Sequence, residues 1–133
     1  MNKELRNKVL PIAKRVRAWT QAKAERANYN PHNLCGWCAI SAAHLFRELS
    51  KADIAAELHI APGHCFVVVD DHIVDVTATQ FMAYETTEVM IAHIKEVEHF
   101  WYYKTEKTFD TPTELREHQL KTRWPKREIC YTR

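Results

Sequence analysis

The chain has little glycine and no long apolar run. Its two glycines are Gly36 and Gly63, and no Gly/Ser-rich or repeated stretch marks a linker between domains. No apolar run approaches the ~20 residues of a membrane-spanning helix, and the first residues are too charged for a signal peptide. With 46% hydrophobic residues, the sequence predicts a single domain over residues 1–133. We therefore expect a protein that stays in the cytoplasm, where it is made.

The chain also lacks an excess of charge of either sign. Its 19 basic and 17 acidic side chains give a net charge of +2, unlike the strongly basic composition of many nucleic-acid-binding proteins. A locally basic stretch from Lys121 to Arg133 is interpreted as a solvated face. We expect neither a nucleic-acid nor a membrane partner, and the sequence leaves the oligomeric state open.

Four cysteines are present, at positions 35, 38, 65 and 130. Without a secretory signal, and with a core of this size, we expect reduced thiols rather than disulfides. Cys35-x-x-Cys38 followed by His64-Cys65 supplies four possible zinc ligands, so a zinc-binding module is an alternative. A redox role has less support, because no βαβ pattern surrounds the Cys-x-x-Cys pair.

Hydrophobic periodicity and capping residues predict helices in three places. Apolar residues spaced by three and four predict an amphipathic helix over about 3–27, and a second helix over about 37–49 has Cys38 on its apolar face. Thr111 as N-cap, followed by Pro112 and then Glu114, forms a capping box that predicts a last helix to about residue 123.

The middle of the chain predicts strands, and hence an α+β fold. Val-rich segments at 66–69 and 73–77 flank Asp70-Asp71 and read as a β-hairpin, while residues 89–103 predict one or two further strands. If the loop is two residues long, His64 and Asp75 are diagonal neighbours on one face, ~7–8 Å apart. A three-residue loop would put Asp75 on the opposite face.

These residues suit a cysteine nucleophile. A helix N-terminus favours the thiolate of Cys38, His64 would accept and return its proton, and Asp75 would orient the imidazole ring. Cys38 on an apolar stripe, taken alone, is more often a packing residue. The order and spacing of the three together favour a catalytic triad.

Three further residues are candidates for binding substrate or the oxyanion. Asn33 belongs to a polar loop before the Cys38 helix, and Trp37 directly precedes that helix. Gln80 follows the second hairpin strand, where it would either close the site or turn the chain. Backbone amides at the helix start are further candidates for holding an oxyanion.

Three stretches together resemble a known family. They are residues 36–41 (GWCAIS), 63–67 (GHCFV) and 73–81 (IVDVTATQF). In order and spacing they resemble the small bacterial and phage members of the transglutaminase-like branch of the papain-like cysteine hydrolases. The resemblance implies a papain-like α+β fold, an antiparallel sheet with the cysteine helix packed against it, and Cys38, His64 and Asp75 as the triad. Cys35 and Cys65 are additional thiols that depart from the family's usual pattern.

The resemblance implies thioester chemistry but not one reaction. Relatives of this kind hydrolyse peptide bonds, cross-link or deamidate glutamine, or transfer acyl groups. We expect a cysteine hydrolase or acyltransferase that acts on an amide or peptide bond of a protein or peptide and needs neither cofactor nor metal. The alternatives are the zinc module and a catalytically inactive relative that binds a protein partner.

Overall fold

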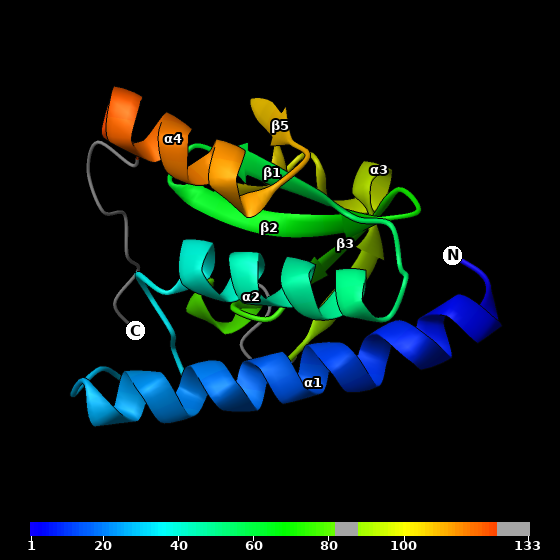
Figure 1. Ribbon diagram of the computed structural model, residues 1–133, viewed down its shortest axis with the longest axis horizontal. Helices are drawn as coiled ribbons and strands as arrows, with labels where there is room; N and C mark the ends of the chain where they lie inside the picture. Colours follow the sequence, from blue (N-terminus) through cyan, green and yellow to red (C-terminus); the bar gives the residue numbers. More distant parts are fainter. Residues whose placement is uncertain (82–87, 125–133) are drawn as a thin grey trace.

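A five-stranded antiparallel sheet forms the centre of the part of the chain that the structure, a computed structural model, describes: residues 1–81 and 88–124. Its strands are β1 (Glu57–Ala61), β2 (His64–Val69), β3 (His72–Asp75), β4 (Met90–His93) and β5 (Lys107–Phe109). They lie side by side in the order β4-β3-β2-β1-β5 (Figure 1).

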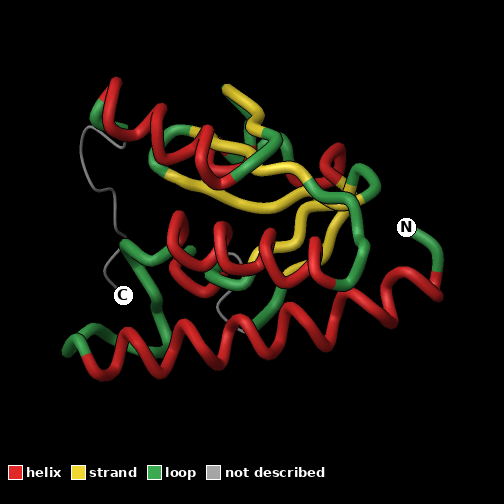
Figure 2. Tube along the Cα trace, viewed as in Figure 1, coloured by secondary structure: helices red, strands yellow, loops and turns green. Residues whose placement is uncertain are grey.

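Helices cover this sheet. They are α1 (Lys3–Arg26), α2 (Cys38–Lys51), α3 (Ile94–Val97) and α4 (Pro112–Thr122), with 3-10 turns η1 (Ala78–Gln80) and η3 (Trp101–Tyr103). Helix α2 lies between the sheet and the long helix α1 (Figures 1 and 2). The predicted α+β class is therefore confirmed, with the Cys38 helix packed against an antiparallel sheet. No helix in the described ranges is long and apolar enough to cross a bilayer.

The helix ends follow their capping residues. Asn2 Oδ1 accepts a hydrogen bond from the Leu5 amide at the start of α1. At the start of α4, the Thr111 side chain accepts from the Glu114 amide, as the capping box predicts. The Glu114 carboxylate in turn accepts from the amide of Asp110. The basic C-terminal stretch extends beyond residue 124 and so lies partly outside the described residues.

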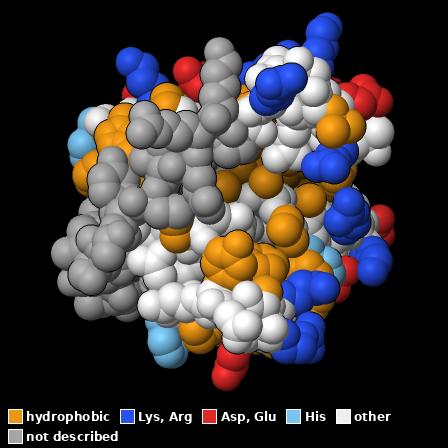
Figure 3. Space-filling view, turned by 90° about the vertical axis from the view of Figure 1, so that its left-hand side faces the viewer, with side chains coloured by type: hydrophobic (Ala, Val, Ile, Leu, Met, Phe, Trp, Pro, Cys, Tyr) orange, Lys and Arg blue, Asp and Glu red, His pale blue; other side chains and the backbone are white. Residues whose placement is uncertain are grey.

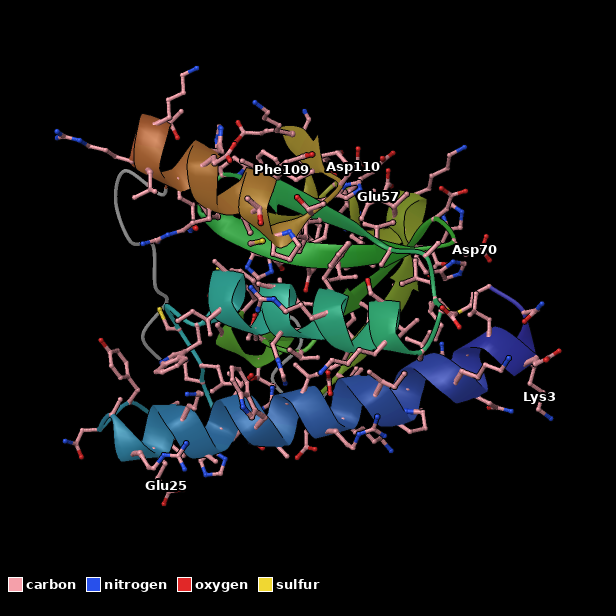
Figure 4. All side chains as sticks on the ribbon, in the orientation of Figure 1. Lys3, Glu25, Glu57, Asp70, Phe109 and Asp110 are labelled. Carbon is pink, nitrogen blue, oxygen red and sulfur yellow. The ribbon has the colours of Figure 1, made fainter. Side chains whose placement is uncertain are left out.

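The β2–β3 hairpin has the two-residue loop that the sequence favours. Val69 pairs with His72, and Asp70 and Asp71 both have positive φ, 48° and 57°, which a type I′ turn requires. In Figure 4 the labelled Asp70 marks this turn, at the end of the molecule opposite to the start of α2. His64 and Asp75, far from the turn, therefore lie at the end of the sheet where α2 begins.

The sheet is buried on both faces. One face, with Val67 and Val74, packs against the buried residues of α1 and α2. The other, with Phe66 and Ile73, packs against aromatic side chains from η3 and against Phe81. Alternation along each strand sends successive side chains into the two cores, which explains why the hairpin strands are almost continuously apolar.

Two strands of the structure have no clear signal in the sequence, and a third region contains less strand than its residues predict. Strand β1 and the three-residue β5 were not predicted; β5 has polar, exposed residues at two of its three positions. Within 89–103 only Met90–His93 is a strand, and α3 and η3 follow it. Aromatic and β-branched residues favour strands locally, but the consecutive aromatic residues of η3 cover one face of the sheet instead of extending it.

Candidate active site

Cys38 is the first residue of α2. The chain reaches this helix through a tight turn in which Gly36 has a φ of 86°, a value that favours glycine. The N-cap residue Trp37 makes no side-chain capping bond. Within the described part of the chain, the amides of Cys38, Ala39 and Ile40 donate to no acceptor. The helix therefore presents unpaired N–H groups beside the thiol.

His64 is the first residue of β2. The β1–β2 hairpin pairs Ala61 with His64, so its loop is Pro62-Gly63, and Gly63 has a φ of 70°. Proline followed by a glycine of positive φ is typical of a type II turn. This turn fixes the position of His64 at the end of the sheet, near the start of α2.

His64 and Asp75 form a buried pair. His64 Nε2 lies 2.7 Å from Asp75 Oδ2, and both side chains are almost fully buried. The Tyr103 hydroxyl donates to the same Oδ2 at 2.6 Å. Asp75 Oδ1 accepts from the backbone amide and the hydroxyl of Thr77, at 2.8 and 3.1 Å. These donors favour the ionised carboxylate.

The electrostatics of the pair favour opposite charges. Burial lowers the pKa of His64, but the Asp75 carboxylate and the hydrogen bonds to Asp75 and Cys38 outweigh it and raise the pKa to about 9. Burial would raise the pKa of Asp75, but the charge of His64 and the hydrogen bonds from His64, Tyr103 and Thr77 lower it overall. Near neutral pH the pair is therefore an imidazolium and a carboxylate.

The second ring nitrogen of His64 faces Cys38 and Gln80. With Nε2 committed to Asp75, Nδ1 is the atom left for the hydrogen bond between His64 and Cys38. Gln80 Nε2 is 3.4 Å from Nδ1, but its two hydrogens have closer acceptors in Thr77 O and Thr77 Oγ1, both at 3.1 Å. His64 thus links the thiol to the carboxylate.

An open cleft of about 530 Å³ leads to Cys38. Both glycines of the chain line it, and so do Gln80 and side chains from α2 and α4. The absence of side chains at Gly36 and Gly63 leaves the approach to the thiol open. Cys38 itself is 8% exposed, whereas His64 is fully buried. A ligand in the cleft would therefore contact the Cys38 thiol and not the buried His64 ring.

The three predicted binding residues occupy different places. Gln80 lies in the cleft and contacts His64, as a site residue would. Asn33 Oδ1 accepts from the Cys35 amide and shapes the loop before α2, and it does not line the cleft. Trp37 packs edge-on against Tyr29 and lines a second hollow that adjoins the cleft.

Two residues that the sequence analysis missed support the site. Tyr103 binds Asp75 from η3, far along the chain. Arg17, buried on α1, donates from Nη1 to Val76 O, Thr79 Oγ1 and Glu88 O, and from Nη2 to His32 O. A run of adjacent aromatics and an arginine on a helix carry no specific sequence signal, although Arg17 does interrupt the apolar stripe of α1.

The state of the cysteines differs from the expectation that all of them are reduced thiols. Cys38 and Cys65 are free, but Cys35 is disulfide-bonded, so the expectation of reduced thiols is wrong for this residue. Cys130 lies outside the described residues. The sequence features behind that expectation do not say which thiols lie close together in the fold.

The zinc alternative finds no support. Cys35 is bonded to another sulfur and cannot serve as a thiolate ligand. Across residues 1–81 and 88–124, no three His, Cys, Asp or Glu side chains form a group that could hold a metal ion. Comparison of the chain with protein-family models, curated proteins and solved structures found no match.

Proposed function

We propose that this protein is a cysteine hydrolase or acyltransferase that forms a thioester between Cys38 and an acyl group released from an amide or peptide bond. The observation that carries the proposal is the chain of contacts from the Cys38 thiol, which lines an open cleft, through His64 to the Asp75 carboxylate. A nucleophile bound to a base, which a third group orients, is the arrangement this chemistry needs.

Because His64 is an imidazolium near neutral pH, the proposed reaction begins with the proton of Cys38 already on His64 Nδ1. The Cys38 sulfur attacks the carbonyl carbon, and the oxyanion binds the unpaired amides at the start of α2. When the intermediate collapses, the carbon–nitrogen bond breaks and the His64 imidazolium gives its proton to the departing amine. A thioester on Cys38 and a neutral His64 result.

In the second half of the reaction, His64 Nδ1 takes a proton from water or from an acceptor amine. The resulting attack on the thioester carbon releases the acid or the new amide and returns Cys38 and His64 to their starting state. Asp75 keeps Nε2–H engaged throughout, so that Nδ1 remains the atom that exchanges the proton. We favour hydrolysis, because a site open to solvent supplies water without a second binding site.

The transglutaminase-like assignment, with its papain-like core, is part of this proposal. It is supported by the packing of the Cys38 helix against an antiparallel sheet and by the order helix, His strand, Asp strand. No specific observation favours an inactive interaction module, because the thiol, imidazole and carboxylate are all present and in contact.

The test is to trap the acyl-enzyme with p-nitrophenyl acetate as the probe. Mixing should release nitrophenol in a burst and add one acetyl group to Cys38, located by mass spectrometry after peptide digestion. C38S should remove both signals, and C65S, the matched control, should keep both. Acetylation that falls equally on other nucleophiles and is unchanged in C38S would refute the proposal.

A further inference from the structure

We propose that the cleft beside Cys38 recognises an acyl group carried by an acidic peptide segment. This inference rests on the proposed thioester chemistry and adds to it a class of substrate. It is drawn from the side chains that line two adjoining hollows: the cleft itself and a second hollow of about 490 Å³.

The cleft beside Cys38 is apolar near the thiol and basic farther away. Ala39, Ala43 and Arg47 follow one another at every fourth position and so form one ridge of α2. The facing wall comes from α4, with Leu115 and Arg116. An apolar wall that ends in guanidinium groups suits a peptide with an apolar residue at the reacting carbonyl and an acidic residue farther along.

The second hollow continues this pattern. It shares Trp19 and Ile40 with the cleft, and its charged lining residues are Lys23 and Arg26. The ammonium group of Lys23 lies over the Trp19 ring, 5.1 Å from its centre. Figure 3, which views the end of the molecule where α2 begins, shows apolar side chains gathered in the middle and Lys and Arg side chains along one side.

The positive charge in these hollows is not neutralised locally. No described residue that lines either hollow is Asp or Glu. None of the four basic lining residues makes an ion pair with another described residue: Lys23, Arg26, Arg47 and Arg116. The chain as a whole has almost as many acidic as basic side chains, so this imbalance is local. Such a surface attracts and orients a negatively charged partner.

A peptide fits the surface better than a nucleic acid does. The α2 wall next to the thiol is formed by Ala39 and Ala43, and the Trp19 ring, which lines both hollows, already stacks on His44 and lies under Lys23 instead of being open to a base. Arg47 lies nine positions after Cys38 in helix α2, a rise of about 13 Å. An extended peptide covers that distance in roughly four residues. We therefore expect an acidic side chain about four residues from the reacting carbonyl.

The test uses three alkylating peptides that differ at one position: iodoacetyl-Gly-Ala-Ala-Glu amide and its Gln and Lys counterparts. Rates of Cys38 modification are measured by mass spectrometry at low and high salt. At low salt the Glu peptide should react roughly threefold faster than the Gln peptide, and the Lys peptide should be slowest. High salt should reduce these differences, because exposed charges are screened.

Two matched variants test whether the preference for the Glu peptide comes from the cleft or from the net charge of the protein. The R47Q/R116Q variant should lose the preference for the Glu peptide, whereas K14Q/K104Q, with the same loss of charge at exposed sites outside both hollows, should keep it. Iodoacetamide should modify Cys38 equally fast in all of them. Equal rates for the Glu and Gln peptides, or a preference that survives in R47Q/R116Q, would overturn the inference.

Two further results have separate meanings. If single-stranded DNA protects Cys38 from iodoacetamide at a lower concentration than a Glu-rich peptide does, the choice of a peptide is wrong. If iodoacetamide does not modify Cys38 in preference to Cys65, the proposed thioester chemistry fails and not merely its substrate class.

Discussion

Tyr103 donates its hydroxyl hydrogen to Asp75 Oδ2 at 2.6 Å, the same oxygen that His64 Nε2 contacts at 2.7 Å. The other carboxylate oxygen accepts from Thr77. The buried Asp75 carboxylate therefore accepts hydrogen bonds on both of its oxygens. The arrangement favours a negative charge on Asp75 and, through it, a positive charge on His64.

Removing the Tyr103 hydroxyl should weaken this network. We expect Y103F to raise the pKa of Asp75, because one hydrogen bond to the carboxylate is lost, and to cost about 1–3 kcal/mol of unfolding free energy. Urea unfolding and the rate of Cys38 alkylation at neutral pH measure the two effects. Y29F removes the hydroxyl of an exposed tyrosine and is the control. Equal behaviour of the two variants would contradict the role given to Tyr103.

Neutralising Asp75 should reduce the reactivity of Cys38 strongly. The charge of Asp75 is a main cause of the raised pKa of His64, so D75N should leave the imidazole largely neutral near pH 7. We expect acetylation of Cys38 to slow by roughly a hundredfold or more. D71N makes the same chemical change in the exposed β2–β3 turn, where asparagine tolerates the positive φ, and should be without effect. A rate in D75N close to that of the parent protein would be incompatible with an orienting role.

Stability should fall as the pH rises through the pKa of His64. The folded protein holds this proton up to about pH 9, whereas an unfolded histidine releases it near 6.5. The contribution is therefore complete below pH 6.5 and disappears by about pH 9, with a maximum of about 3 kcal/mol. Urea unfolding at intervals between these values measures the slope. H99Q, at an exposed position, should keep the slope, and an unfolding free energy independent of pH in this window would contradict the buried ion pair.

Arg17 should be the most sensitive position on α1. Its guanidinium group ties the loop before α2 to the segment after β3, through His32 and Val76 among others. R17K keeps the charge but cannot reproduce this set of bonds, and we expect a loss of at least about 2 kcal/mol of unfolding free energy. R15K, two residues away and exposed, is the matched control. Denaturation midpoints that agree for both variants would show that the hydrogen bonds of Arg17 do not contribute to stability.

Much of the site could be predicted because it depends on local sequence. The two-residue loop at Asp70-Asp71 sets the register of the hairpin, and the register puts His64 and Asp75 on one face. Helix α2 begins at Cys38 within one residue of expectation, because a glycine-containing turn precedes a run of good helix formers. These features are decided by neighbours in the chain.

The missing parts depend on contacts between distant segments. Strand β5 is short and mostly exposed, and it is a strand because β1 offers it a free edge. Tyr103 reaches Asp75 across 28 positions of sequence, and Arg17 reaches Val76 across 59. The disulfide at Cys35 is likewise a matter of proximity in space. Hydrophobic periodicity and motif spacing do not predict such long-range contacts.

The central claim, that His64 activates Cys38, is tested most directly by the competition of Cys38 and Cys65 for iodoacetamide in one sample. Cys65 is the internal reference, because burial raises the pKa of its thiol well above the usual range. Near neutral pH we expect alkylation of Cys38 and not of Cys65 in the parent protein, and a large loss of the Cys38 rate in H64A. Rapid modification of Cys38 that persists unchanged in H64A, or equal modification of Cys38 and Cys65, would contradict the account.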